Sequence, residues 1–248
     1  MPIFDDDDAS GFKTTGSGFQ FSGTNVNTLQ NASEYTLVVI AADVSSSVTS
    51  FAQEIEGCLK SSLEACQKSP RVDNLLTRFL TFNHKVVEQH GFRPLSDCHL
   101  DKYTGSIHPS GSTSLYDASV NAVDSAATYG KALQDQEYTT NAVVVILTDG
   151  MDVGSTLKAH HVKEAVARAR KGESLESIMT ILVGINVTDS EVSRYLTAFK
   201  DEAGFDQYVE AKDATPKTFA RIAGFISKSV SSVSQSVGSG GPSAPITF

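Results

Sequence analysis

The chain has 248 residues, of which 20 are basic and 29 acidic, and its formal net charge is −9. Its basic residues form no stripe, which excludes nucleic-acid binding as a function class. No run approaches the ~18 apolar residues that cross a bilayer, and the start lacks the basic and apolar segments of a secretory signal, so we expect a cytoplasmic protein without a membrane partner.

The two ends differ in composition from the middle, which predicts three parts. Residues 1–33 are rich in Gly, Ser, Thr and Asn and carry the acidic block Asp5 to Asp8, and residues 231–248 are rich in Ser, Gly and Pro. Such segments bury too little apolar area to offset chain entropy, so we expect flexible tails around a domain at 34–230. The phenylalanines of the first tail leave room for a short strand or a docked segment.

Strand and helix signals alternate without interruption between the tails. Apolar runs bounded by polar residues predict buried strands, and apolar positions at helical spacing predict helices. The expected order is a strand at 35–43, a helix at about 47–68, a hairpin of strands at 75–82 and 85–91, a long polar loop at 93–112, a helix at 114–134, a strand at 142–148, a helix near 156–171, a strand at 178–186, a helix capped by Asp189, a short strand at 207–210 and a last helix from Pro216 to about 230. This alternation predicts an α/β fold: a doubly wound, mostly parallel sheet with helices on both faces and one antiparallel strand.

Closely spaced oxygen donors follow the first predicted strand. Asp43, Ser45 and Ser47 come at every second position, just before a helix. Ligands of open α/β sheets bind outside the carboxyl ends of the strands, and a carboxylate with two hydroxyls suits Mg²⁺, Mn²⁺ or Ca²⁺ better than zinc. The alternative for these residues alone is an ordinary helix N-cap, where Ser and Asp are also favoured.

Two later segments bring further oxygen donors to strand or loop ends. Thr113 lies in a loop that runs into a helix, GSTSLYDA at 111–118, and Asp149 ends a buried strand in LTDG at 147–150. Together with DVSSS at 43–47, these ordered motifs resemble those of the von Willebrand factor type A (vWA) domain family, with its metal-ion-dependent adhesion site. The resemblance covers roughly the whole region between the tails.

The resemblance implies a sheet of six principal strands in the order 3-2-1-4-5-6, with the antiparallel strand at one edge. It also implies a metal site in which Ser45, Ser47 and Thr113 bind the ion directly or nearly so. Asp43 and Asp149 would act directly or through water. The expected ion is Mg²⁺, with Mn²⁺ or Ca²⁺ as alternatives.

The resemblance implies protein binding rather than catalysis. A metal held mainly by neutral hydroxyls attracts an anionic oxygen from outside, which in this family is usually a Glu or Asp side chain of a protein partner. Many intracellular bacterial members work beside ATPases or other assembly factors, so we expect a partner of that kind. The sequence has no G-x-S-x-G elbow and no phosphate-binding loop, which also argues against an enzyme.

Two other functions stay open, a metal-dependent hydrolase and a structural assembly component whose metal only holds the loops together. The hydrolase would activate water on the ion, with His108 as the nearby titratable side chain. Asp152 is a further candidate carboxylate for the site, against the alternative of an exposed loop charge. The block Asp5 to Asp8 could enter the site of its own chain or of a neighbour and so cause self-association, although acidic runs usually only keep a tail solvated.

The three cysteines are Cys58, Cys66 and Cys98. The first two lie eight residues apart on one predicted helix, a separation of about 12 Å that a disulfide does not span. We therefore expect buried free thiols, which fits a reducing compartment.

Overall fold

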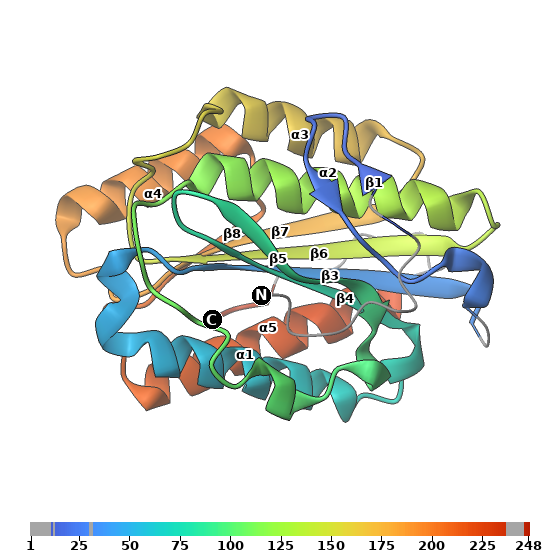
Figure 1. The fold of residues 1–248 in the computed structure, drawn as a ribbon, viewed down its shortest axis with the longest axis horizontal. Helices are drawn as coiled ribbons and strands as arrows, with labels where there is room; N and C mark the ends of the chain where they lie inside the picture. The colour runs from blue at the N-terminus through green and yellow to red at the C-terminus, as the bar shows by residue number, and fades with distance from the viewer. Residues whose placement is uncertain (1–10, 12, 30–31, 237–245) are drawn as a thin grey trace.

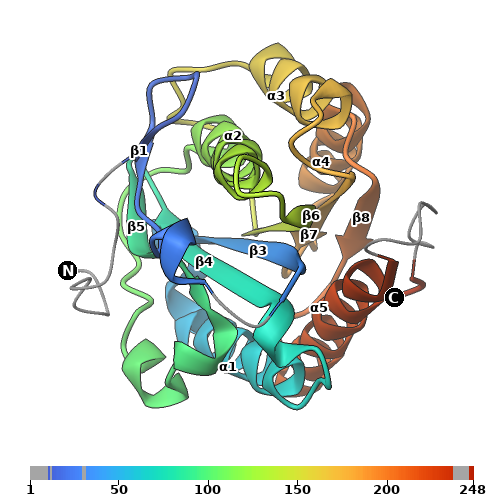
Figure 2. The same ribbon diagram turned by 90° about the vertical axis from the view of Figure 1, so that its right-hand side faces the viewer.

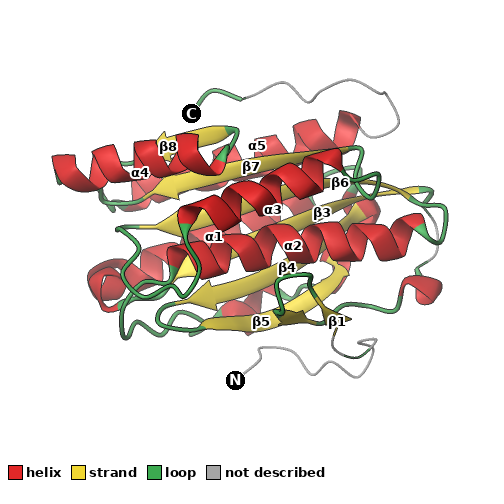
Figure 3. Cartoon of the chain, turned by 90° about the horizontal axis from the view of Figure 1, so that it is seen from above, coloured by secondary structure: helices red, strands yellow, loops and turns green. Residues whose placement is uncertain are grey.

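The protein is represented by a computed structural model that describes residues 11, 13–29, 32–236 and 246–248. Its centre is a six-stranded sheet (Figure 1) made of β3 (Glu34–Asp43), β4 (Leu75–Phe82), β5 (Val86–Pro94), β6 (Thr139–Thr148), β7 (Ser177–Gly184) and β8 (Gln207–Glu210). The strands lie in the order β5-β4-β3-β6-β7-β8, which Figure 3 shows from above. Only β5 is antiparallel to its neighbour. The predicted fold class, hairpin and strand order are confirmed.

Five helices cover the two faces of this sheet, because their apolar stripes match apolar residues on both sides of the strands. Along β3, Leu37 and Val39 belong to one core cluster and Val38 and Ile40 to the other, as the period of a strand requires. On one face lie α1 (Ala52–Gln67) and α5 (Pro216–Ser236), and on the other lie α2 (Leu115–Gln134), α3 (Ala159–Lys171) and α4 (Ser190–Ala203) (Figures 1 and 2). The sheet is therefore buried on both faces, with the ends of its strands left for function.

Local signals fix most helix boundaries. The Asp189 side chain accepts a hydrogen bond from the backbone of Glu191, as expected of an N-cap, and Gly204 ends α4 in the left-handed region at φ 72°. The predicted helix at 47–68 instead opens with a 3₁₀ turn before α1. The 3₁₀ segments of the chain are η1 (Val26–Thr28), η2 (Ser46–Phe51), η3 (Val72–Asn74), η4 (Leu95–Asp97) and η5 (Leu100–Tyr103).

Residues 13–29 of the first predicted tail belong to the fold, in line with the short strand or docked segment that its phenylalanines allow, so the folded part begins before residue 34. Strands β1 (Lys13–Thr14) and β2 (Gln20–Phe21) form an antiparallel pair beside α2 and β5 (Figure 2). Phe21 is fully buried, and the backbone of Phe92 in β5 exchanges hydrogen bonds of 3.0 and 2.7 Å with Ser22 and Thr24. The apolar content expected to be too small suffices because it docks on an existing sheet edge. The block Asp5 to Asp8 lies outside the described residues.

The second predicted tail is ordered in its described parts as well. The apolar stripe of α5 continues through Val230 and Val233, both fully buried, so the helix runs six residues past the expected end. Phe248 packs edge-on against Phe225 with a ring-centre distance of 5.9 Å. All three cysteines are buried and free, as expected. Within the described ranges, no helix is both long and apolar enough to cross a membrane.

Candidate metal centre

Asp43 anchors the candidate site at the carboxyl ends of the two central strands. Because Ala42 of β3 pairs with Leu147 of β6, Asp43 lies level with Thr148. The Thr148 hydroxyl donates to Asp43 Oδ2 at 2.7 Å, and the backbone N–H of Ser45 donates to Oδ1 at 2.8 Å. Both oxygens of this buried carboxylate are thus held in place by the fold.

Ser45, Ser47 and Asp149 form a chain of oxygens beside this carboxylate. The hydroxyls of Ser45 and Ser47 lie 3.0 Å apart, and the Ser47 hydroxyl donates to Asp149 Oδ1 at 2.8 Å. Ser45 precedes η2, yet its hydroxyl makes no capping hydrogen bond to that turn. Ser45 is thus the N-cap residue of η2 by position, but its hydroxyl lies beside that of Ser47 and does not cap the turn.

The loop that carries Thr113 is joined to the first motif through the backbone. The N–H of Ser110 donates to the carbonyl of Val44 at 2.8 Å, and the N–H of Ser46 donates to the carbonyl of Gly111 at 3.0 Å. Gly111 has φ 72°, and a Cβ there would lie 2.4 Å from Nδ1 of His84, so the turn needs glycine. Within the described ranges, no hydrogen bond joins the Thr113 hydroxyl to the other four predicted ligands, although its loop lies against them.

The oxygen set fits a small hard cation. Oxygens bound to Mg²⁺ at ~2.0–2.1 Å in an octahedron have neighbours about 2.8–3.0 Å away. The spacings along the Ser45–Ser47–Asp149 chain are 3.0 and 2.8 Å, so a cation could replace the shared hydrogens with little movement. The described residues contain no group of three His, Cys, Asp or Glu side chains suited to a metal. Any ion here would thus depend on hydroxyl ligands, as the predicted set does.

The two carboxylates are both held in surroundings that favour a nearby cation. Burial raises the pKa of Asp43 to about 6, against hydrogen bonds from Ser45 and Thr148 that favour the charged form, and the charge of Asp149 adds to the increase. Burial also raises the pKa of Asp149. A cation placed between them would lower both pKa values, because it stabilises the charged forms.

Asp152 does not belong to the oxygen cluster. Its Oδ1 accepts hydrogen bonds from the Ser155 hydroxyl at 2.5 Å and from the backbone N–H of Tyr116 at 3.3 Å. Asp117 in turn accepts from the backbone N–H groups of Thr156 and Leu157. These contacts fasten the loop after β6 to the first turn of α2, so Asp152 is not a free loop charge.

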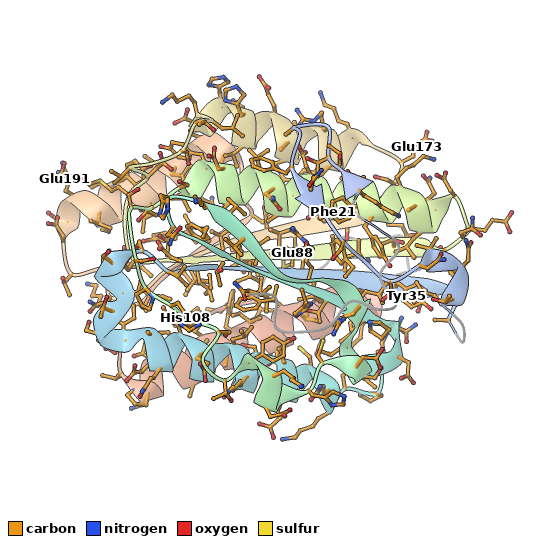
Figure 4. All side chains as sticks on the ribbon, viewed as in Figure 1. Phe21, Tyr35, Glu88, His108, Glu173 and Glu191 are labelled. Atoms are coloured by element: carbon orange, nitrogen blue, oxygen red, sulfur yellow. The ribbon has the colours of Figure 1, made fainter. Side chains whose placement is uncertain are left out.

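An open pocket of about 730 Å³ lies at the same end of the sheet. It lies between the start of α1 and the loop before Thr113, and its lining includes Thr49, Glu54 and His108. Figure 4 shows His108 toward the end of the sheet where the parallel strands finish, far from Tyr35 and Glu173. His108 thus lies at the same end of the sheet as the first motif, on its rim, as expected.

Solved structures of low sequence identity share this fold. The PilB minor pilin from Streptococcus sanguinis matches with a TM-score of 0.55 and 14% identity over 80% of this chain and 62% of its own. The pilus adhesin SpaC from Lactobacillus rhamnosus GG matches with a TM-score of 0.57 and 10% identity over 86% of this chain and 32% of its own. Proximal thread matrix protein 1 from the mussel byssus, with a zinc-occupied MIDAS motif, matches with a TM-score of 0.53 and 17% identity over 79% of this chain and 46% of its own.

These likenesses concern the fold alone, because the identities are low. No protein-family model matches the sequence, and no curated protein matches it either. The chain spans less than two thirds of the length of each of these three structures. The resemblance to a vWA-like fold thus rests on the likeness to these solved structures and on the three ordered motifs of the sequence.

Proposed function

We propose that this chain is a divalent-metal-dependent protein-binding module of the adhesion or scaffold type. The observation that carries the proposal is the oxygen chain of Ser45, Ser47 and Asp149 beside the anchored carboxylate of Asp43. In the proposed site these four residues and Thr113 hold the ion, with Mg²⁺ as the expected metal and Mn²⁺ or Ca²⁺ as alternatives.

The chemistry of the donors explains why such a site would bind a partner. Each oxygen of Asp43 already accepts a hydrogen bond from the fold, so its negative charge is partly compensated by protein donors. The serine and threonine hydroxyls bring no charge. Where the two aspartates act through water, an ion held by these hydroxyls keeps much of its positive charge, and its chemistry is to bind an anionic oxygen, such as a Glu or Asp carboxylate of a partner protein.

The structural neighbours support the adhesion or scaffold type of this proposal. One is a matrix protein with a zinc-occupied MIDAS motif, and others are a minor pilin and a pilus adhesin. We further propose that the chain binds without catalysing a reaction, that it works in the cytoplasm, and that its partner is an assembly factor such as an ATPase. The three buried free cysteines support a reducing compartment.

Metal binding tests the first half of the proposal. Calorimetric titration with Mg²⁺ and Mn²⁺ should give one site in the wild type and at least a tenfold loss of affinity in Asp149→Asn, which keeps the shape but removes the charge. Asp73→Asn is the matched control, because this exposed aspartate precedes β4 at the opposite end of the strands. Equal affinity in wild type and Asp149→Asn would contradict the assignment.

Carboxylate recognition tests the second half. Two displayed heptapeptide libraries with a fixed central residue, Glu in one and Gln in the other, and with flanking positions that are random but exclude Asp and Glu, would be selected on the wild-type protein in Mg²⁺ and in EDTA. We expect capture only from the Glu library and only with Mg²⁺. Capture that ignores the metal or the charge of the central residue would rule out this function.

A further inference from the structure

Val153 is an apolar side chain held in solvent. Its exposure is 76%, and Val87 of β5, at 41%, is the other large apolar residue exposed in the part of the chain that the structure describes. The residue lies on the loop between β6 and α3, which runs at the end of the molecule where the parallel strands finish (Figure 1). Single exposed apolar residues are common, so the position of Val153 is what matters.

That position is directly beside a predicted metal ligand. The backbone N–H of Val153 donates to the carbonyl of Thr113 at 2.9 Å, and the N–H of Gly154 donates to the same oxygen at 2.9 Å. Residues joined by a backbone hydrogen bond of this kind lie roughly 5 Å apart. Val153 therefore borders the candidate metal site.

The loop holds Val153 in this place firmly. On one side, the N–H of Asp152 donates to the Tyr195 hydroxyl at 3.1 Å, and the Asp152 carboxylate accepts from Ser155. On the other, Gly154 packs so closely that a Cβ would lie 2.8 Å from the hydroxyl oxygen of Ser112. Because both neighbours of Val153 are held by contacts, a partner that covers the residue need not order the loop first.

We propose that Val153 and the metal form one recognition surface, and that the partner segment carries an apolar side chain one or two residues from the carboxylate that binds the ion. This inference rests on the proposed function. In an extended peptide, neighbouring residues are about 3.3 Å apart and alternate ones share a face, so one segment reaches both features. The partner is thus a protein segment that pairs an acidic residue with an aliphatic or aromatic one.

The central-Glu library provides the test, with wild type, Val153→Ser and Val87→Ser selected in parallel. Wild type and Val87→Ser should enrich apolar residues at one or two positions from the Glu, whereas Val153→Ser should lose that enrichment. Peptides selected on the wild type should bind Val153→Ser about five- to tenfold more weakly. All three proteins should bind Mn²⁺ equally in calorimetry, because the substitutions leave the metal ligands intact.

The outcomes separate this inference from the proposed function. If the wild type captures Glu peptides with Mg²⁺ but shows no apolar preference, or if Val153→Ser keeps that preference, the role of Val153 is refuted and the metal-dependent module stands. If no protein captures Glu peptides in a metal-dependent way, the proposed function fails, and the inference about Val153 fails with it.

Discussion

At the scale of the residue, Asp43 lies in a place where folding favours a neutral group but metal binding needs a charged one. Its carboxylate is buried at 1% exposure and accepts hydrogen bonds from Ser45 and Thr148. These two donors are too few to offset burial, so the pKa of Asp43 is raised to about 6. At neutral pH the metal-free protein thus keeps a charge where a neutral group would be more stable.

We predict that this conflict appears as a pH-dependent stability in EDTA. The pKa of Asp43 is raised in the folded state from 3.8 to about 6. The contribution of this carboxyl group to the free energy of unfolding is therefore fully present below pH 3.8 and is lost as the pH rises through 6. The loss is at most about 3 kcal/mol, because each tenfold change in proton affinity corresponds to ~1.4 kcal/mol. Urea denaturation at pH 4.5 and 7.5 in EDTA measures it.

Asp43→Asn is the variant that isolates this effect. The amide keeps the shape, and the Thr148 hydroxyl can turn to accept from it, so the fold should persist. We expect Asp43→Asn to lack the part of the pH dependence described above and to gain no stability from Mg²⁺. An identical pH dependence in wild type and variant would show that Asp43 is not the group responsible.

The same residues show what sequence could predict at this scale. Asp43, Ser45, Ser47 and Asp149 were predicted as one site, and the structure brings them together because their motifs end neighbouring parallel strands. Thr148 was missed, because a threonine at the end of an apolar strand looks like any other strand residue. The contact between Asp152 and the backbone of Tyr116 was missed as well, since Tyr116 lies in a helix start 36 residues earlier in the chain.

At the scale of the element, the segment 13–29 is an integral part of the fold. It covers the edge strand β5, and it reaches an ion pair of the buried Arg78: Arg78 donates to Glu88 at 2.6 Å, and the same carboxylate accepts from the Ser22 hydroxyl at 2.7 Å. The guanidinium of Arg78 also lies over the Phe21 ring, 5.7 Å from its centre. Loss of this segment would expose both an apolar patch and a charge pair to water.

We therefore predict that Phe21→Ala destabilises the protein by about 3–4 kcal/mol, as truncations of buried aromatic side chains do. Gln20→Ala, at the exposed neighbouring position, is the control and should change the stability by less than about 0.5 kcal/mol. Urea denaturation measures both. A neutral Phe21→Ala would mean that the segment does not contribute to the stability of the domain.

Two glycines in helices should respond oppositely to replacement by alanine, one with a gain and the other with a loss of stability. A Cβ at Gly224 of α5 would meet nothing within 4 Å, so Gly224→Ala should stabilise by about 0.5–1 kcal/mol through helix propensity. A Cβ at Gly130 of α2 would lie 2.6 Å from Leu175 and 2.9 Å from the carbonyl of Ser174. Gly130→Ala should therefore destabilise by about 1–3 kcal/mol.

Thermal unfolding of the two glycine variants checks this pair. The melting temperature of Gly224→Ala should rise and that of Gly130→Ala should fall, relative to wild type. Because the residue change is the same, propensity cancels and packing explains the difference. A fall in Gly224→Ala would reveal that α5 needs a close approach at this position that the structure does not contain.

At the scale of the whole molecule, the order of the strands was predictable because three motifs identified a known arrangement. The two central strands are apolar on both faces and read directly as buried. The ends of the domain were not predictable, because local composition cannot show that Phe21 or Val233 finds a surface made by distant residues. Docking of such segments depends on the finished fold rather than on their own sequence.

The last prediction links the metal site to the stability of the whole molecule. A ligand that binds only the folded state stabilises it by RT ln(1 + [L]/Kd), which is about 2.7 kcal/mol at a hundredfold excess over Kd. The gain measured by urea denaturation in Mg²⁺ should equal the value calculated from the calorimetric Kd, because the proposal contains a single site. Asp73→Asn should show the same gain as wild type, and the gain of Asp149→Asn should be smaller by about 1.3 kcal/mol or more at the same Mg²⁺ concentration, as its at least tenfold weaker affinity requires. A gain larger than calculated would require a second site, and an undiminished gain in Asp149→Asn would place the ion away from the carboxyl ends of β3 and β6.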